Sequence, residues 1–198
     1  NVLEPFYLGG EYDYLLNSNR QMDLLHKRFI VFELDNISEN RTLLPVVTII
    51  IMETFLAKMR RLQGVRKVLL LEEAWKAIAK EGMASYVRYL FKTVRKYFGE
   101  AIVVTQEVED IISSPIVKES IINNADCKIL LDQRKYRNKF DQIQTLLGLT
   151  DKERAQVLSI NLSNDPARRY KEVFISRGGV QSAVYATEVS DEEYLVRP

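Results

Sequence analysis

Two adjacent carboxylates, Glu72 and Glu73, directly follow an apolar run at Val68–Leu71. Such a run is typical of a strand covered on both faces in a parallel sheet, and ligands of these sheets bind beyond the carboxyl ends of the strands. Paired acids at this place suit phosphoryl transfer, a reaction that depends on positioning and charge neutralisation. One acid can hold Mg²⁺ and its neighbour can orient the attacking water. The alternative is that the two acids begin a helix and interact favourably with its dipole.

The segment after the two acids contains three regularly spaced cations and a glutamine that could belong to a functional site. A helix is expected at about residues 83–98, and it carries Arg88, Lys92 and Arg95 in one narrow stripe, apart from its apolar stripe. The cations are either solvated or placed to meet phosphate. The next expected strand, Ala101–Thr105, ends at Gln106.

A further expected strand, Cys127–Leu131, ends at Asp132–Gln133 and is followed by a basic cluster, which consists of Arg134, Lys135, Arg137 and Lys139. The cluster is either a solvated loop or a contact for an acidic partner or a DNA backbone, and phosphate contacts of this kind carry no sequence information. The single cysteine, Cys127, is expected in the core. With one cysteine and one histidine, the chain lacks the residues for a disulfide or a zinc site.

The composition describes an ordinary globular chain. With 198 residues and 46% hydrophobic content, we expect one domain over residues 1–198. The net charge of +1 gives no overall cationic field for nucleic acid. The longest apolar stretch, Leu43–Met52, contains a proline and is shorter than the roughly 20 residues that span a bilayer. Because the chain begins with Asn1, we expect it to be part of a longer protein.

Strand and helix signals alternate along the chain, which indicates an α/β fold with a mainly parallel sheet flanked by helices. A long buried helix is expected at about residues 44–62, and Thr150–Glu153 has the pattern of a helix capping box. Turn residues at 177–179 predict a C-terminal β-hairpin. The expected strands are Arg28–Asp35, Val68–Leu71, Ala101–Thr105, Cys127–Leu131, Tyr170–Ser176 and Val180–Thr187.

A phosphate-binding loop is missing from this pattern. P-loop ATPases hold phosphates with G-x-x-x-x-G-K-[ST], in which backbone amides surround the anion and the lysine adds a fixed charge. None of the eight glycines here is followed by lysine. Either the chain is not a P-loop protein, or its Walker A segment lies upstream of Asn1.

Residues 69–111, from LLLEEAW to VTQEVEDI, resemble the TraG family of conjugative-transposon ATPases, which are relatives of the type IV secretion ATPases. The resemblance continues in FYLGGEYDYLLN, RFIVFELD, LLGLTDKE and SAVYATEVSDEEYL, and so covers essentially the whole chain. It implies the C-terminal part of a RecA-like P-loop NTPase core that lacks its Walker A segment.

The resemblance also implies roles for single residues. Glu72 takes the metal-associated position, contacting Mg²⁺ directly or through water, although the family more often has aspartate there. Glu73 is the base that polarises the attacking water, and Gln106 senses the γ-phosphate or orients that water. Arg95 and Lys96 match an arginine motif that stabilises transition-state charge, either in its own subunit or from a neighbouring one.

The expected function is therefore that of a conjugation or type IV secretion motor that hydrolyses ATP with Mg²⁺. The resemblance implies a homo-oligomer at the cytoplasmic face of the inner membrane, attached through conjugation machinery proteins. We expect the isolated chain to be nearly inactive. Two alternatives stay open: a DNA-translocating coupling-protein ATPase, and a non-catalytic module that docks to proteins or contacts DNA non-specifically.

Overall fold

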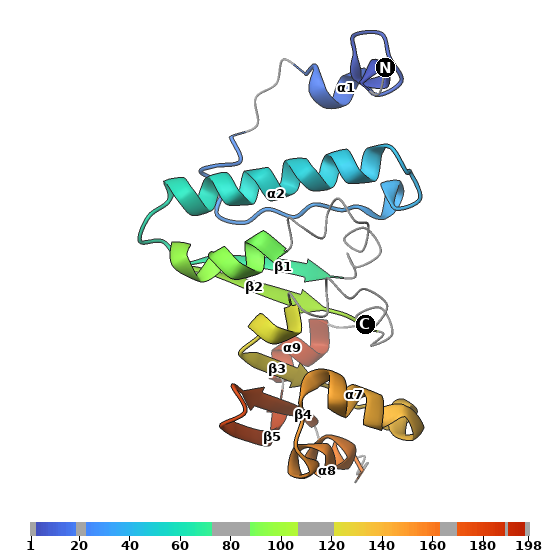
Figure 1. Cartoon of the computed structure of the whole chain (residues 1–198), viewed down its shortest axis with the longest axis vertical. Helices are drawn as coiled ribbons and strands as arrows, with labels where there is room; N and C mark the ends of the chain where they lie inside the picture. Colours follow the sequence, from blue (N-terminus) through green and yellow to red (C-terminus); the bar gives the residue numbers. More distant parts are fainter. Residues whose placement is uncertain are drawn as a thin grey trace. The chain divides into compact units, whose positions relative to one another are not determined.

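The computed structural model describes residues 3–18, 23–72, 88–106, 121–162, 170–188 and 190–196. They belong to two compact units, Asn1–Leu62 and Gln63–Pro198, and each is considered by itself (Figure 1). The expectation of a single domain stays a prediction. No helix in the described ranges combines the length and the apolar content needed to cross a bilayer.

The first unit is built around α2, Leu43–Arg61, which confirms the long helix predicted there. The Asn40 side chain accepts hydrogen bonds from the amides of Thr42 and Leu43 at 3.0 and 2.9 Å, and so satisfies amide groups where the helix begins. Three cations in the last turn suit the helix dipole. The other helices of the unit are short: η1 at Glu4–Phe6, α1 at Asp13–Leu16 and η2 at Asp35–Ile37.

The strand predicted at Arg28–Asp35 is not formed. Residues 28–34 have no regular structure, and Asp35 begins η2. Phe29 is 85% exposed and Val31 is 70% exposed. A β-strand requires a hydrogen-bonded neighbour, and none of the described strands pairs with this segment. The β-pattern of these residues is therefore not enough to form a strand without a pairing partner.

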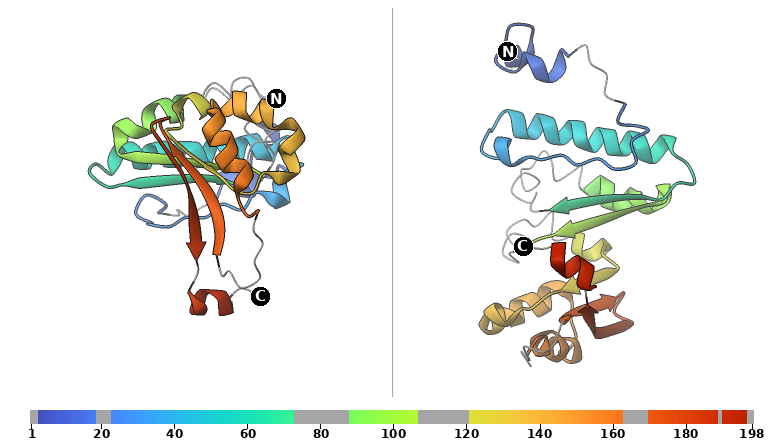
Figure 2. Two further views of the ribbon diagram at one scale, coloured as in Figure 1. Left: turned by 90° about the horizontal axis from the view of Figure 1, so that it is seen from below. Right: turned by 180° about the vertical axis from the view of Figure 1, so that it is seen from behind.

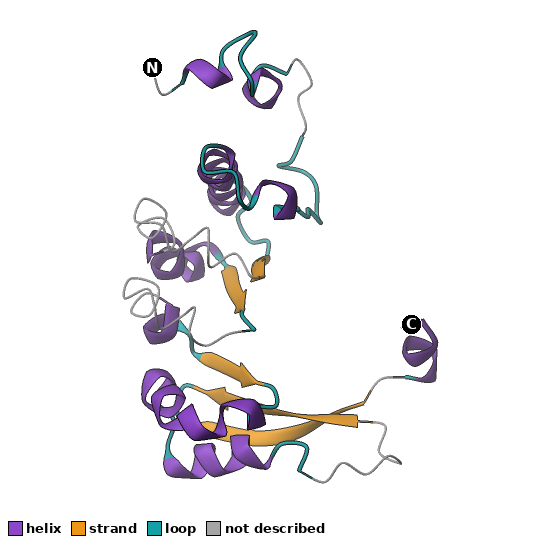
Figure 3. Ribbon diagram, turned by 90° about the vertical axis from the view of Figure 1, so that its right-hand side faces the viewer, coloured by secondary structure: helices purple, strands orange, loops and turns teal. Residues whose placement is uncertain are grey.

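The second unit contains two sheets. In the first, β1 at Lys67–Glu72 pairs in parallel with β2 at Gly99–Val104. In the second, β3 at Cys127–Leu130, β4 at Tyr170–Arg177 and β5 at Gln181–Glu188 pair antiparallel in this order. The β4–β5 pair is the predicted hairpin, and its two long strands are seen in Figure 2. The α/β class is thus confirmed (Figure 3), although the described strands form a parallel pair and a separate antiparallel sheet where one mainly parallel sheet was predicted.

Helices α7, Phe140–Leu147, and α8, Asp151–Ser159, belong to the core of the antiparallel sheet. Phe140, Ile160 and Phe174 are fully buried there. The remaining elements are the 3-10 helices η3 at Val94–Tyr97, η4 at Ile122–Asn124 and η5 at Arg134–Lys139, and the terminal helix α9 at Asp191–Val196.

Cys127 is exposed, which corrects the prediction that it belongs to the core. It is the first residue of β3, and side chains alternate between the two faces of a strand. Cys127 therefore shares a face with Ile129, which is 61% exposed. The partly buried Leu130, on the other face, packs against the core.

The capping box predicted at Thr150–Glu153 is present at the start of α8. The Glu153 carboxylate accepts hydrogen bonds from the Thr150 amide at 2.9 Å and from the Ser176 hydroxyl of β4 at 2.8 Å. Burial by itself would raise the pKa of Glu153, but these hydrogen bonds outweigh it and hold the pKa below its ordinary value. The carboxylate thus joins α8 to the hairpin.

We expect Glu153→Ala to lower the free energy of unfolding by about 2 to 4 kcal/mol at pH 7, because it removes a cap and leaves buried donors unpaired. The depressed pKa means that the carboxylate's contribution is present above the unfolded value, near 4.5, and is lost as the pH falls through the folded value. Urea unfolding at pH 7 and pH 3 measures both effects, with the exposed Lys152→Ala as control. An equal loss at the two pH values would contradict this role.

Candidate functional site at the carboxyl ends of the parallel strands

Glu72 is the last residue of β1, and its side chain is exposed. It therefore belongs to a strand, which excludes for Glu72 the alternative of a helix start. In the parallel register Glu72 lies opposite Val104, the last residue of β2. Glu73 lies outside the described residues, so its predicted role as base stays a prediction.

Gln106 follows β2 by two residues and is exposed. Because Glu72 and Val104 are register partners, both strands end at the same level, and Gln106 continues beyond it. The sheet pairing thus brings the ends carrying Glu72 and Gln106 to one edge, where ligands of parallel sheets bind. This edge is the candidate site.

The sequence predicted that the strand at Val68–Leu71 is covered on both faces, but one face of the β1–β2 pair is partly exposed. Four apolar side chains on this face are 38 to 55% exposed and alternate with more buried residues: Val68, Leu70, Ile102 and Val104. Leu71, on the other face, is buried. In the part of the chain that the structure describes, the β1–β2 pair is therefore covered mainly on one face.

Arg95 and Lys96 lie at the opposite end of β2. Both belong to η3, which leads into the strand through Phe98, a residue with a left-handed φ of 57°. The buried Lys67, at the start of β1, donates from Nζ to the carbonyl oxygen of Tyr97 at 2.8 Å and so attaches this turn to the amino end of the sheet. β2 has six residues, about 20 Å along the strand, so the two cations are remote from Glu72 in the same chain.

The two faces predicted for the preceding helix are confirmed over residues 88–95, whereas Phe98, predicted as the end of its apolar stripe, is 60% exposed. Residues 88–93 are helical, and Leu90, Phe91 and Val94 are buried. Arg88, Lys92 and Arg95 are exposed. Arg95 forms an ion pair with Asp126 at 3.0 Å, and both side chains are largely exposed. This pair connects the segment before β2 to the residue before β3.

A second contact connects the other ends of these strands. The Tyr136 hydroxyl in η5, after β3, lies 3.5 Å from the backbone oxygen of Gln106, after β2. The segments before the two strands are joined by Arg95 and Asp126, and those after them by Tyr136 and Gln106. β2 and β3 consequently run in the same sense, and the end of β3 belongs to the candidate edge.

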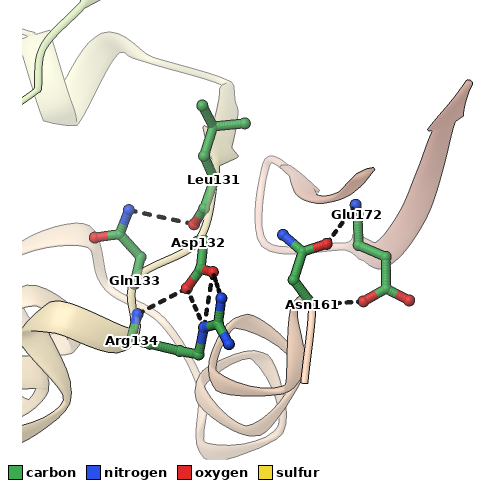
Figure 4. A network of polar contacts seen from close by, with 6 residues as sticks. All are labelled: Leu131, Asp132, Gln133, Arg134, Asn161 and Glu172. Carbon is green, nitrogen blue, oxygen red and sulfur yellow. Dashed lines mark hydrogen bonds and ion pairs between the residues drawn. The ribbon is translucent and has the colours of Figure 1, made fainter. Parts of the chain in front are cut away.

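The residues after β3 form a network that the sequence did not predict (Figure 4). Arg134 donates from Nε to the two oxygens of Asp132 at 2.9 and 2.7 Å and from its backbone amide at 3.0 Å. The hydrogen bonds from Arg134 lower the pKa of Asp132, and Asp132 in turn raises the pKa of Arg134. Within the basic cluster, the charge of Arg134 is therefore compensated locally.

Glu72 is the carboxylate that β1 carries to this edge. Among the described residues, no group of three or more His, Cys, Asp or Glu side chains could hold a metal. Mg²⁺ is commonly bound through one or two carboxylates together with waters and substrate phosphates. The exposed Glu72, at the strand end, suits such a shared site.

Comparisons with known proteins define the class of this chain as a P-loop domain. VirB4 of Thermoanaerobacter pseudethanolicus is similar in structure, with a TM-score of 0.62 at 22% identity over 84% of this chain and 43% of that chain. The model of the TraG P-loop domain matches residues 1–197, and the chain belongs to this family. The resemblance found in the sequence is thereby confirmed, and the fold is that of a P-loop domain.

A curated relative is the type IV secretion system protein CagE of Helicobacter pylori, which is 28% identical over 155 residues. The match covers 76% of this chain and 15% of CagE. The chain thus spans less than half of either relative.

Proposed function

We propose that this chain is the C-terminal part of the ATPase domain of a motor that hydrolyses Mg²⁺-ATP and drives a conjugation or type IV secretion machine. The observation that carries the proposal is the register of β1 and β2, which brings Glu72 and Gln106 to one edge. Membership of the TraG P-loop family and similarity to VirB4 and CagE support it.

In this proposal, Glu72, Glu73 and Gln106 have different roles in ATP hydrolysis, according to what their side chains can bind or accept. Glu72 holds the divalent ion, directly or through water, and the bound ion neutralises charge on the phosphate oxygens. Glu73 follows Glu72 in sequence and takes a proton from the attacking water. Gln106 has an uncharged amide that can donate to the γ-phosphate and accept from the water, so it orients the two reactants.

Arg95 serves a neighbouring copy in this proposal. About 20 Å of strand separates it from the edge of its own chain, which is too far for a side chain to reach. Its exposed pair with Asp126 is readily exchanged, because exposed ion pairs contribute little free energy. Its guanidinium can bind a phosphate with two hydrogen bonds, and Lys96 adds a second charge. The motor is therefore a homo-oligomer with sites between subunits.

The phosphate loop comes from a segment outside this chain. We expect a version extended upstream of Asn1 to hydrolyse ATP at least about 100-fold faster than the chain alone, because backbone donors and a lysine enter together. Steady-state turnover of the two proteins at equal concentration and saturating Mg²⁺ measures the difference. Equal turnover would contradict the proposal.

The exposed part of the basic cluster favours a second candidate, a DNA-translocating coupling-protein ATPase. Lys135, Arg137 and Lys139 of η5 are exposed. In this case DNA would stimulate ATP hydrolysis, and stimulation would fall steeply with salt as counterions compete for the phosphates. A secretion-assembly motor would lack this response. In both cases the protein works with machinery proteins at the cytoplasmic face of the inner membrane.

A further inference from the structure

Phe98 has a backbone conformation that its side chain does not favour. Its φ of 57° is left-handed, and the described residues contain one other non-glycine residue of this kind, Asn161. Asparagine tolerates the left-handed region, whereas a bulky side chain there is an outlier that costs free energy. Glycine is the usual residue where a helix ends in this way, and Phe98 ends η3. The aromatic side chain is therefore kept at a cost to the folding of its own chain.

The Phe98 side chain contributes little to the core of its own chain. It is 60% exposed, whereas Leu90 and Val94 of the same apolar stripe are 1% and 4% exposed. Val65, two residues before β1, is 51% exposed. Because β1 and β2 run parallel, Val65 and Phe98 both lie at the amino end of the strand pair (Figure 1). An exposed aromatic side chain in such a place suits a protein interface, where aromatic residues are enriched.

The turn that carries Phe98 is held firmly from β1. The amide of the buried Lys67 donates to the carbonyl oxygen of Phe98 at 3.2 Å, and its Nζ donates to that of Tyr97 at 2.8 Å. The Phe98 amide in turn donates to the carbonyl oxygen of Arg95 at 3.2 Å, so these two residues belong to one fixed turn. A group that is fixed before contact loses little conformational entropy when a partner binds.

Charge complementarity indicates which partner meets this turn. Arg95 and Lys96 are exposed and precede Phe98 by three and two residues. The opposite end of the same strand pair carries the exposed Glu72, followed in sequence by Glu73. The amino end of one copy is thus basic where the carboxyl end of another is acidic. A head-to-tail contact between such ends repeats from copy to copy and closes into a ring or extends into a filament.

We infer that Phe98 anchors a head-to-tail interface between two copies of this chain, beside Arg95, and that the strained turn is kept for this contact. A second copy is the partner because its acidic edge is the place that Arg95 has to reach. This inference rests on the proposed function, which gives Arg95 to a neighbouring copy, and adds the residue that holds the two copies together.

The test uses Phe98→Gly in the extended protein. Glycine adopts the left-handed conformation without strain, so the urea midpoint of unfolding should stay the same or rise. The Kd of self-association, measured by sedimentation velocity, should rise at least about 10-fold, because anchor residues carry much of the binding energy of an interface. ATP turnover should fall at low protein concentration and recover as the concentration rises. Val180→Ser, at an 88% exposed position in the hairpin turn, is the control and should change none of these quantities.

A lower urea midpoint in Phe98→Gly would overturn the inference, since the side chain would then serve the fold of its own chain. Phe98→Asn, which also tolerates the left-handed region, is the second variant. Unchanged self-association and turnover in both variants would overturn the inference, as would an unmodified protein that hydrolyses ATP as a monomer. These results would leave ATP hydrolysis itself in place. Absence of hydrolysis in the unmodified extended protein would instead contradict the proposed function.

Discussion

Replacing Glu73→Gln in the extended protein is expected to lower kcat for ATP about 100- to 10,000-fold and to change the Kd of Mg²⁺-ATP less than about threefold. The amide is close in shape to the carboxylate but cannot take a proton from water, and general-base catalysis contributes a factor of this size. Binding depends on the phosphate loop and the metal, which the substitution leaves in place. Single-turnover hydrolysis and equilibrium binding of a fluorescent nucleotide measure the two quantities.

Two further variants show whether a lower kcat in Glu73→Gln reflects loss of the base. Glu72→Gln should raise the Mg²⁺ concentration needed for half-maximal hydrolysis, because it removes a charge from the metal-associated position. Glu100→Gln changes an exposed acid near the amino end of β2, where it pairs with Arg66, and should leave hydrolysis unaltered. Normal turnover in Glu73→Gln would support the docking module instead of the motor.

Replacing Arg95→Ala should lower kcat of the extended protein about 1,000-fold or more, the size of effect known for arginines that stabilise phosphoryl-transfer charge from a second subunit. Because Arg95 lies at the amino end of β2, its chain cannot use it at its own edge. A mixture of Arg95→Ala and Glu73→Gln subunits should therefore recover activity, since some interfaces combine an intact acid with an intact arginine. Turnover of each variant alone and of the mixture tests this arrangement.

Lys92→Ala is the control for charge in the same cationic stripe, and Asp126→Ala releases Arg95 from its ion pair. Both should retain turnover within a few-fold, because neither removes the guanidinium. Full activity in Arg95→Ala would show that the arginine is an ordinary surface cation. Loss of activity without recovery in the mixture would exclude action across an interface.

The parts of the fold that depend on local signals could be predicted from the sequence. The apolar runs of β1 and β2, the turn of the hairpin and the capping box at Thr150 are each encoded within a few residues. The segment at Arg28–Asp35 has an equally good strand pattern, but a strand exists only with a partner, which a local pattern does not supply. For the same reason, the alternation of side chains on β3 could not show which face of the strand is covered, and Cys127 lies on the exposed face.

The candidate site shows the same division. Glu72 ends β1 and Gln106 follows β2 by two residues, so parallel pairing of the two strands is enough to bring them to one edge. Helical periodicity identified the stripe that carries Arg95, and the order of helix and strand places it before β2. Its ion pair with Asp126 joins segments far apart in the sequence and could not be predicted from periodicity.

The structure of the extended protein bound to Mg²⁺ and a non-hydrolysable ATP analogue tests the role of the β1–β2 edge most directly. We expect the terminal phosphate and the metal ion beside the carboxyl ends of these strands, with Glu72 in reach of the metal ion or one of its waters and Gln106 in reach of the phosphate. Nucleotide bound elsewhere, or the Glu72 and Glu73 carboxylates directed away from it, would contradict the assignment of this chain as the catalytic edge of a motor.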